Sequence, residues 1–137
     1  MSTIIRPEIS RKNKYWINKH RHYELKHFCL QYPEWKRAYY SSPSISSSMS
    51  NDPSRSSSYG DPTARHAMRK IHYIERIKLI ERLAGEADKD LHNYILKGVT
   101  EGLSYTYLRT KLGIPCSRDM YYDRYRKFFW LLDNARD

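Results

Sequence analysis

Two tight turns in the last third of the chain, which we call the corners, largely determine how the chain can fold. In each corner a glycine is followed within a few positions by a serine: Gly102 by Ser104, and Gly113 by Ser117. Glycine readily takes the left-handed conformation that ends a helix, and a serine hydroxyl accepts a hydrogen bond from the free N–H groups that begin the next helix. The corners therefore predict three successive helices, over 89–102, over 105–112 and from 117 onward.

The third of these helices is predicted to be amphipathic. Its large apolar residues recur at three- and four-residue spacing and are expected to face the core: Tyr121, Tyr125, Phe128 and Leu132. The opposite face then carries Asp119, Asp123, Arg126, Lys127 and Trp130, with Arg118 and Tyr122 at the helix start. A helix, a short helix, a turn containing glycine and a longer helix follow one another in the order of a helix-turn-helix unit.

The N-terminal part of the chain also predicts helices. Residues 12–31 contain no Pro or Gly, and one stripe recurs at helical spacing: Trp16, His20, Tyr23, His27 and Leu30. Pro33 cannot continue this helix, but proline suits the first turn of a second helix over 33–40.

A long central helix is expected to follow. Asp61 is its predicted cap and Pro62 its first residue, and we expect it to end near Ala84 with Gly85 as the left-handed residue. Asp88 is then the candidate cap of the next helix.

A serine-rich segment separates the two groups of helices. Residues 41–58 hold eleven serines among eighteen residues. Such a composition buries too little apolar surface to offset the entropy of ordering, so we interpret 41–60 as a flexible linker. The predicted organisation is all-α: basic aromatic N-terminal helices over 1–40, the linker, and a helical domain over 61–137 with a helix-turn-helix at about 89–135.

The charge of the chain points to an anionic partner. There are 25 Lys and Arg against 15 Asp and Glu, a net charge of +10, and residues 1–40 alone carry +6. A chain of 137 residues leaves little room for a deep substrate cleft. The sequence has no Gly-rich phosphate loop and no group arranged for nucleophilic or acid–base chemistry, so we expect a protein that is not an enzyme and that needs no cofactor.

Metal binding and membrane insertion are not expected either. His20 and His22, like His27 and Cys29, are two residues apart and point about 200° apart on a helix, so neither pair can close on one ion. The two widely separated cysteines suit a reducing compartment. Neither a secretion signal nor an apolar run of about eighteen residues is present, which favours a cytoplasmic protein.

The corners also carry a resemblance to a known family. The run 96–105 (LKGVTEGLSY), followed by Tyr107-Leu108 and Leu112-Gly113-Ile114, resembles the fourth region of bacterial sigma factors. In that family a helix ends at a Glu-Gly-Leu-Ser corner, the next helix is a scaffold, and a serine-capped helix enters the major groove. The basic N-terminus and the run 121–126 (YYDRYR) are similar to small phage-encoded transcription regulators of the RinA and ArpU type. The resemblance implies that the partner is double-stranded DNA, in the cytoplasm of a bacterial host cell.

On this basis the predicted DNA-binding residues lie on the last two helices and the turn between them: Arg109, Lys111, Ser117, Arg118, Tyr122, Arg124, Arg126 and Lys127. Arg118 offers a two-pronged donor to guanine, and Ser117 with the free amides of the helix start suits a backbone phosphate. Arg109 stands where the family prefers a small residue, so it is expected to point outward or to splay the helices. A secondary phosphate-binding set is expected in the N-terminal helices: Lys14, Lys19, Arg21 and Lys26.

Other functions are also compatible with the sequence. The N-terminal aromatics and cations are residue types that stack on single-stranded bases, although an aromatic core with a basic outer face explains them better. A small basic phage inhibitor of the anti-CRISPR kind, acting on a protein or ribonucleoprotein complex, and the DNA-recognition subunit of a viral packaging terminase fit the same composition. The sequence is also compatible with contacts between the N-terminal helices and RNA polymerase or another nucleoprotein complex, and with oligomerisation.

Overall fold

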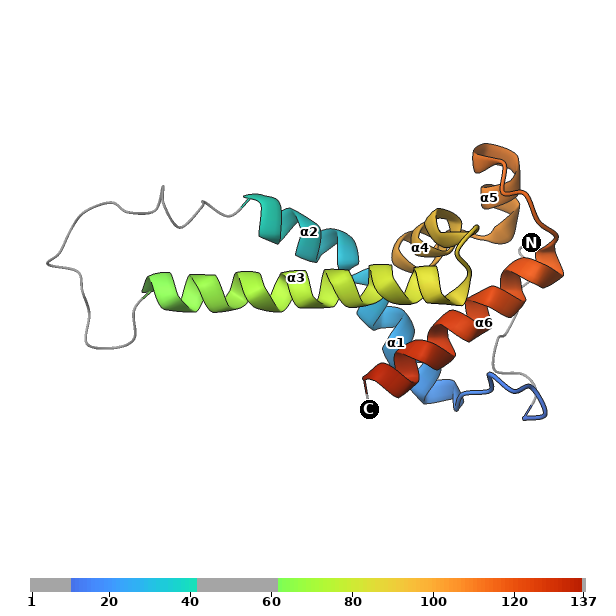
Figure 1. The fold of residues 1–137 in the computed structure, drawn as a ribbon, viewed down its shortest axis with the longest axis horizontal. Helices are drawn as coiled ribbons and strands as arrows, with labels where there is room; N and C mark the ends of the chain where they lie inside the picture. The colour runs from blue at the N-terminus through green and yellow to red at the C-terminus, as the bar shows by residue number, and fades with distance from the viewer. Residues whose placement is uncertain (1–10, 42–61, 137) are drawn as a thin grey trace, which may run out of the picture.

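The described part of the chain, residues 11–41 and 62–136 of a computed structural model, is helical and contains no strand. This confirms the all-α prediction. The helices, in chain order, are α1 (Lys19–Leu30), α2 (Tyr32–Ser41), α3 (Pro62–Ala87), α4 (His92–Glu101), α5 (Tyr105–Leu112) and α6 (Arg118–Ala135) (Figure 1). Apart from Ser41, the predicted linker over 41–60 lies outside the described residues, as does the predicted cap Asp61.

The longest helix, α3, forms the axis of the molecule (Figure 1). Its C-terminal half packs against α4 and α6, and α1 packs against both of those helices in turn. α2 runs back along α3, from Tyr32 beside Glu81 to Tyr39 beside Lys70. α5 packs against α4 at the end of the molecule where α3 ends (Figure 1).

All of these helices contribute to one hydrophobic core. Leu25 and Cys29 of α1 are buried in the same cluster as Ile80 of α3, Ile95 of α4 and Phe128 of α6. The division into residues 1–40 and 61–137 therefore describes a difference in composition and not two separate cores. Both N-terminal helices, α1 and α2, contribute buried residues to this core.

The predicted N-terminal helix is corrected in its length and in its buried face. It begins at Lys19, and residues 11–18 precede it as a non-helical segment. His20, Tyr23 and His27 are exposed, whereas the buried face consists of His22, Leu25, Phe28 and Cys29. The physical reason is that this sequence can present either of these two faces to the core. α4 and α6 cover the face that has fewer polar groups.

The end of the central helix is a second correction. α3 runs through Gly85 to Ala87, and Gly85 does not take a positive φ. A Cβ at Gly85 would lie 3.6 Å from the His92 ring, so the glycine sits where the start of α4 approaches α3. α4 itself starts at His92 and not at Lys89, because residues 89–91 form a turn first.

The buried side of α6 is broader than predicted. Tyr121, Phe128 and Leu132 are fully buried, as expected, but Tyr125 is only half-buried and Phe129 is 1% exposed. Phe129 is buried because α6 is covered by α1 as well as by α3, which extends the core around one side of the helix.

Candidate nucleic-acid interface

The two corners have the backbone geometry that the sequence predicts. Gly102 and Gly113 have φ values of 70° and 69°, and they are the residues with positive φ in the described chain. The Ser104 hydroxyl accepts a hydrogen bond from the Tyr107 N–H, and the Ser117 hydroxyl accepts one from the Met120 N–H, both at 3.2 Å. Both caps are therefore built, and the starts of α5 and α6 are fixed by local chemistry.

Buried groups hold the turn between α5 and α6. Ile114 is 0% exposed, and its N–H donates to the Leu108 carbonyl at 3.0 Å. The Tyr105 hydroxyl donates to the Cys116 carbonyl. Cys116, in the turn before α6, is thereby tied to the first residue of α5, 11 positions earlier in the chain.

Tyr122 contributes to the same support. Its hydroxyl accepts a hydrogen bond from the Tyr105 N–H at 3.3 Å, and its ring packs edge-on against Tyr121, with ring centroids 4.9 Å apart. The sequence predicts Tyr122 as a DNA contact. In the structure this half-buried side chain joins α6 to α5.

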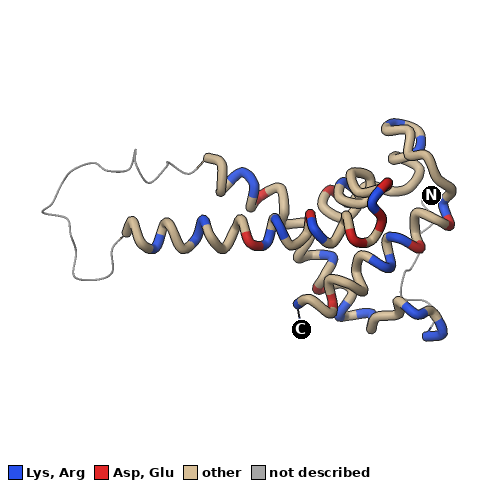
Figure 2. The backbone as a smooth tube through the Cα atoms, in the orientation of Figure 1, with Lys and Arg blue, Asp and Glu red and all other residues tan. Residues whose placement is uncertain are grey.

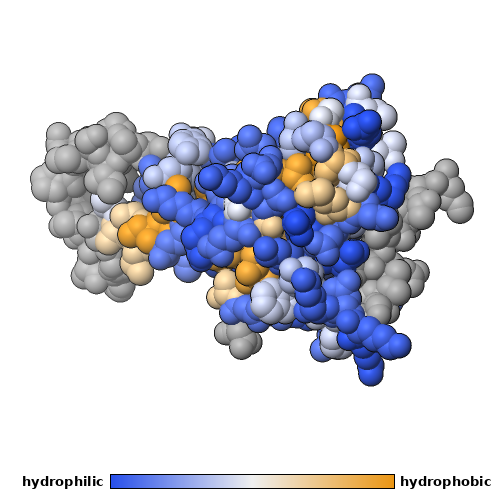
Figure 3. All heavy atoms as spheres, turned by 45° about the vertical axis from the view of Figure 1, so that its right-hand side comes forward, coloured by the Kyte–Doolittle hydropathy of each residue, from blue (hydrophilic) through white to orange (hydrophobic). Residues whose placement is uncertain are grey.

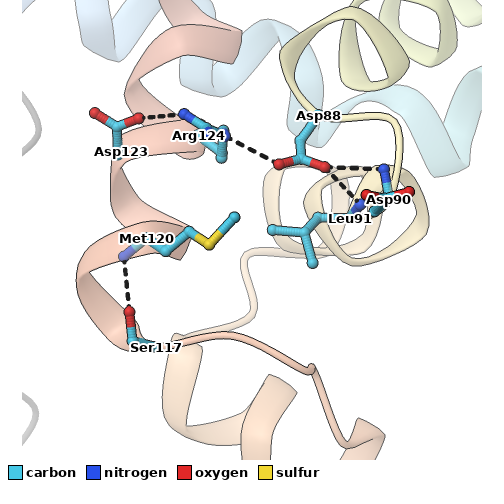
Figure 4. Close-up of polar contacts among 7 residues, drawn as sticks. All are labelled: Asp88, Asp90, Leu91, Ser117, Met120, Asp123 and Arg124. Carbon is cyan, nitrogen blue, oxygen red and sulfur yellow. Dashed lines mark hydrogen bonds and ion pairs between the residues drawn. The ribbon is translucent and has the colours of Figure 1, made fainter.

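Arg124 is another predicted DNA contact that is already engaged within the protein (Figure 4). Its Nε donates to Asp88 Oδ2 at 2.9 Å and its Nη1 donates to Asp123 Oδ2 at 2.6 Å. The other oxygen of Asp88 accepts from the N–H groups of Asp90 and Leu91. Asp88 thus fastens α6 to the turn between α3 and α4 while it caps that turn.

The charges of this pair are stabilised by their surroundings. Burial acts to raise the pKa of Asp88, but the hydrogen bonds from Arg124 and the two backbone N–H groups outweigh it, so the pKa lies below its ordinary value. The hydrogen bond to Asp88 correspondingly raises the pKa of Arg124. The predicted phosphate contact is a positioning residue for α6 in this structure.

The remaining predicted cations of α5 and α6 differ in their exposure. Arg109, Lys111 and Arg118 are exposed, whereas Arg126 and Lys127 are half-buried on α6. Arg109 donates to the Ile114 carbonyl at 3.3 Å, so it lies over the turn instead of splaying the helices. Arg126 Nε is buried and has no hydrogen-bond partner within the described ranges.

Arg118 stands at the exposed start of α6. Its Nη2 donates to the Thr106 hydroxyl at 3.2 Å, and its guanidinium lies 5.3 Å from the centroid of the Tyr105 ring. The hydrogen bond to Thr106 is at the surface, and Arg118 itself remains exposed. We call the outward side chains of α5, the turn and α6 as far as Lys127 the α5–α6 surface. From Tyr105 to Lys127 the chain has six Lys or Arg against two Asp.

The N-terminal segment 11–18 adds cations beside α6. The ring of Tyr15 lies 5.7 Å from the ring of Trp130, centroid to centroid, so this segment covers part of the outer face of α6. Lys14 lies over the Tyr15 ring at 5.0 Å. Figure 2 shows Lys and Arg along α5, at the start of α6 and in this segment, all at one end of the molecule. Sequence reasoning missed Arg11 and Lys12 here, although Trp130 on a charged face was a signal that something covers it.

The other predicted phosphate-binding residues lie on α1. Arg21 pairs with Asp133 at 2.6 Å and with Glu24 at 3.5 Å, and the hydrogen bond to Asp133 raises its pKa. Asp133 is sixteen residues from Ser117, which corresponds to about 24 Å along α6. Lys19 is exposed and Lys26 is half-buried on the same helix. The structure therefore places Arg21 near the C-terminal end of α6, away from its capped start.

The described ranges hold neither a cluster of metal-binding side chains nor a helix suited to crossing a membrane. Within residues 11–41 and 62–136, no three His, Cys, Asp or Glu side chains come together in a way that would hold a metal ion. None of the helices in these ranges combines the length and the apolar character that a bilayer crossing requires.

Comparison with known proteins gave no match to a protein family, to a curated protein or to a solved structure.

Proposed function

We propose that this chain is a DNA-binding transcriptional regulator of the small phage type, in which α4, α5 and α6 act as a helix-turn-helix and α6 is the recognition helix. The observation that carries the proposal is the start of α6. It is capped, exposed and flanked by outward cations of α5, while the buried side of the same helix is held by the core.

This arrangement supplies the contacts that duplex DNA requires. The N–H groups at the start of α6 and the Ser117 cap suit a backbone phosphate, and Arg109 and Lys111 lie where they can reach the flanking phosphates. Arg118 is the candidate reader of guanine, since an arginine donates to guanine O6 and N7 together. Segment 11–18 extends the positive surface beside α6.

Of the two carboxylates of the α5–α6 surface, one has a role in sequence selectivity in this proposal. Asp119 is exposed in the first turn of α6, and Asp123 pairs with Arg124 one turn later. A carboxylate repels phosphates but accepts a hydrogen bond from cytosine N4. Asp119 then weakens binding to most sequences and favours a site with a suitably placed cytosine.

The test is selection of binding sites from a random duplex library by the whole chain, followed by anisotropy titration of the enriched duplex. We expect one enriched motif and an affinity that falls steeply between about 50 and about 200 mM salt, since each phosphate neutralised adds about 0.9 to the slope. Asp119→Asn is expected to raise the affinity for unselected duplexes. Lys97→Ala is the matched control, because Lys97 is exposed on α4 and pairs with Glu101 at 3.8 Å. An unenriched library with no salt-dependent binding would contradict the proposal.

A further inference from the structure

The opposite end of the molecule carries an apolar stripe that continues from the edge of the core onto the surface. The first half of α3, residues 62–74, extends beyond the body with α2 beside it (Figure 1), and we call this part, together with α2, the arm. Met68 is 66% exposed, Ile71 is 55% exposed and Tyr40 is 69% exposed. The stripe follows helical spacing along α3 through Ala64, Ala67, Met68, Ile71 and Ile74. Figure 3 shows an apolar patch on the arm.

A groove lies beside this stripe, between α2 and α3. Tyr39 of α2 lines one side, and Ala67, Lys70, Ile71 and Ile74 of α3 line the other, around a volume of about 260 Å³. Pockets for small-molecule ligands are usually larger, about 300–1,000 Å³. A groove of this size, continuous with an exposed apolar stripe, suits the side chain of a protein partner that also covers the stripe.

The charge of the arm decides between the candidate occupants. Residues 62–74 hold Arg65, Arg69 and Lys70 and no acidic residue, and α2 holds Lys36 and Arg37 against Glu34. A second copy of this chain would bring the same cations against them, and like charges at an interface are costly. Nucleic acid would satisfy the cations but would leave Met68 and Ile71 in water. An acidic partner with apolar anchors would neutralise the cations and also cover Met68 and Ile71.

We infer that the arm docks an acidic amphipathic helix of another protein. One apolar anchor of that helix enters the groove between Tyr39 and Ile74, and further apolar side chains cover Met68 and Ile71. Its Asp and Glu side chains face Lys70, which lines the groove. This is the helix-in-groove mode, in which anchors at i, i+3, i+4 and i+7 lie on one face. The inference is independent of DNA binding, because the arm and the α5–α6 surface are at opposite ends of the molecule (Figure 1).

The experiment uses the whole chain and a fluorescein-labelled helical peptide with Leu at i, i+3, i+4 and i+7 and Glu at most other positions. Anisotropy titration is expected to show saturable binding that Ile71→Asp weakens about tenfold or more, since loss of a central anchor has effects of this size. The control Leu112→Asp changes an exposed apolar residue of α5, 37% exposed, and is expected to leave peptide binding unchanged. A peptide with the same composition and scrambled order is expected to bind more weakly.

Three results would overturn the inference. One is the absence of saturable peptide binding, and another is equal loss in Ile71→Asp and Leu112→Asp. The third is a different occupant. Sedimentation equilibrium of the chain alone would reveal a dimer that Ile71→Asp dissociates, and single-stranded DNA that displaces the peptide and binds Ile71→Asp less well would identify nucleic acid. Circular dichroism of both variants checks that they are folded.

Discussion

The two ends of this molecule are both positively charged, but they are held in different ways. At the α5–α6 end, helix caps, buried tyrosines and the Asp88–Arg124 pair fix each backbone element against another. In the arm, the first half of α3 has α2 as its neighbour and keeps Met68 and Ile71 in contact with water. The difference indicates that a rigid surface presents polar groups at one end, while the other end has an apolar surface left for a partner.

The largest expected effect at the rigid end is that of Gly98→Ala. A Cβ at Gly98 would lie 2.0 Å from the Tyr121 hydroxyl, which belongs to a fully buried side chain of α6. Relief of this overlap requires α4 and α6 to move apart, so we expect a loss of about 2–3 kcal/mol in the free energy of unfolding, measured by urea denaturation.

A double variant tests the cause of that loss. The Tyr121 hydroxyl has no hydrogen-bond partner in the described part of the chain, so Tyr121→Phe alone is expected to be neutral or slightly stabilising. Combined with Gly98→Ala, it removes the overlapping atom and leaves the ring carbon at 3.3 Å. Stability of the double variant close to the wild type is the expected result, and a double variant as unstable as Gly98→Ala would show that the overlap is not the cause.

The Asp88–Arg124 pair is expected to have the next largest effect. Asp88→Asn removes the charge and keeps the size of the side chain, and it should cost about 1–2 kcal/mol because Arg124 then loses one of its two charged partners and keeps only Asp123. The folded pKa of Asp88 is lowered, so its contribution is complete above the ordinary value of about 3.9 and is lost as the pH falls through the lower folded value.

Stability as a function of pH is the measurement for this pair. The loss in the free energy of unfolding as the pH falls below about 4 should be smaller in Asp88→Asn than in the wild type. Asp90→Asn, which changes an exposed neighbour, is expected to keep the wild-type profile. Identical profiles for all three proteins would show that the charge of Asp88 does not stabilise the position of α6.

The cap of α6 is expected to have a smaller effect on stability. Ser117→Ala removes the acceptor for the Met120 N–H and should cost about 1 kcal/mol. Ser117→Asp, which restores an acceptor, is expected to recover most of the loss in thermal unfolding. A loss that Ser117→Asp fails to recover would argue against capping as the reason for the serine.

The smallest effect is expected in the arm. Ile71→Ser replaces a 55% exposed apolar side chain, so the free energy of unfolding should change by no more than about 0.5 kcal/mol. Urea denaturation checks this value. A loss comparable with that of Gly98→Ala would mean that Ile71 belongs to the core, and the contrast between the two ends would no longer hold.

Sequence reasoning succeeded where the signal is local. Gly102 and Gly113 each end a helix through their own φ, and Ser104 and Ser117 cap helices that start at the next residue. These features depend on a few neighbouring positions, so the corners and the helices around them could be predicted without knowledge of the tertiary contacts.

Features that depend on distant contacts could not be predicted in the same way. The buried face of α1 is chosen by α4 and α6, and the sequence alone offers His20 and Tyr23 as readily as Leu25 and Phe28. Arg124 meets Asp88 across 36 positions. The cover of Trp130 by Tyr15 joins the two ends of the chain. Gly85 has two common uses, as a helix end or as a site of close approach, and only the position of His92 distinguishes them.

The proposed function requires that α6 reads duplex DNA through its exposed start. Its most direct test is anisotropy titration of the enriched duplex with the wild type, Arg118→Ala and the control Lys97→Ala. We predict that Arg118→Ala binds the enriched duplex with an affinity lower by about 1–3 kcal/mol and tolerates changes at one guanine, while Lys97→Ala binds like the wild type. Equal binding by Arg118→Ala and the wild type, with the guanine preference retained, would contradict the claim.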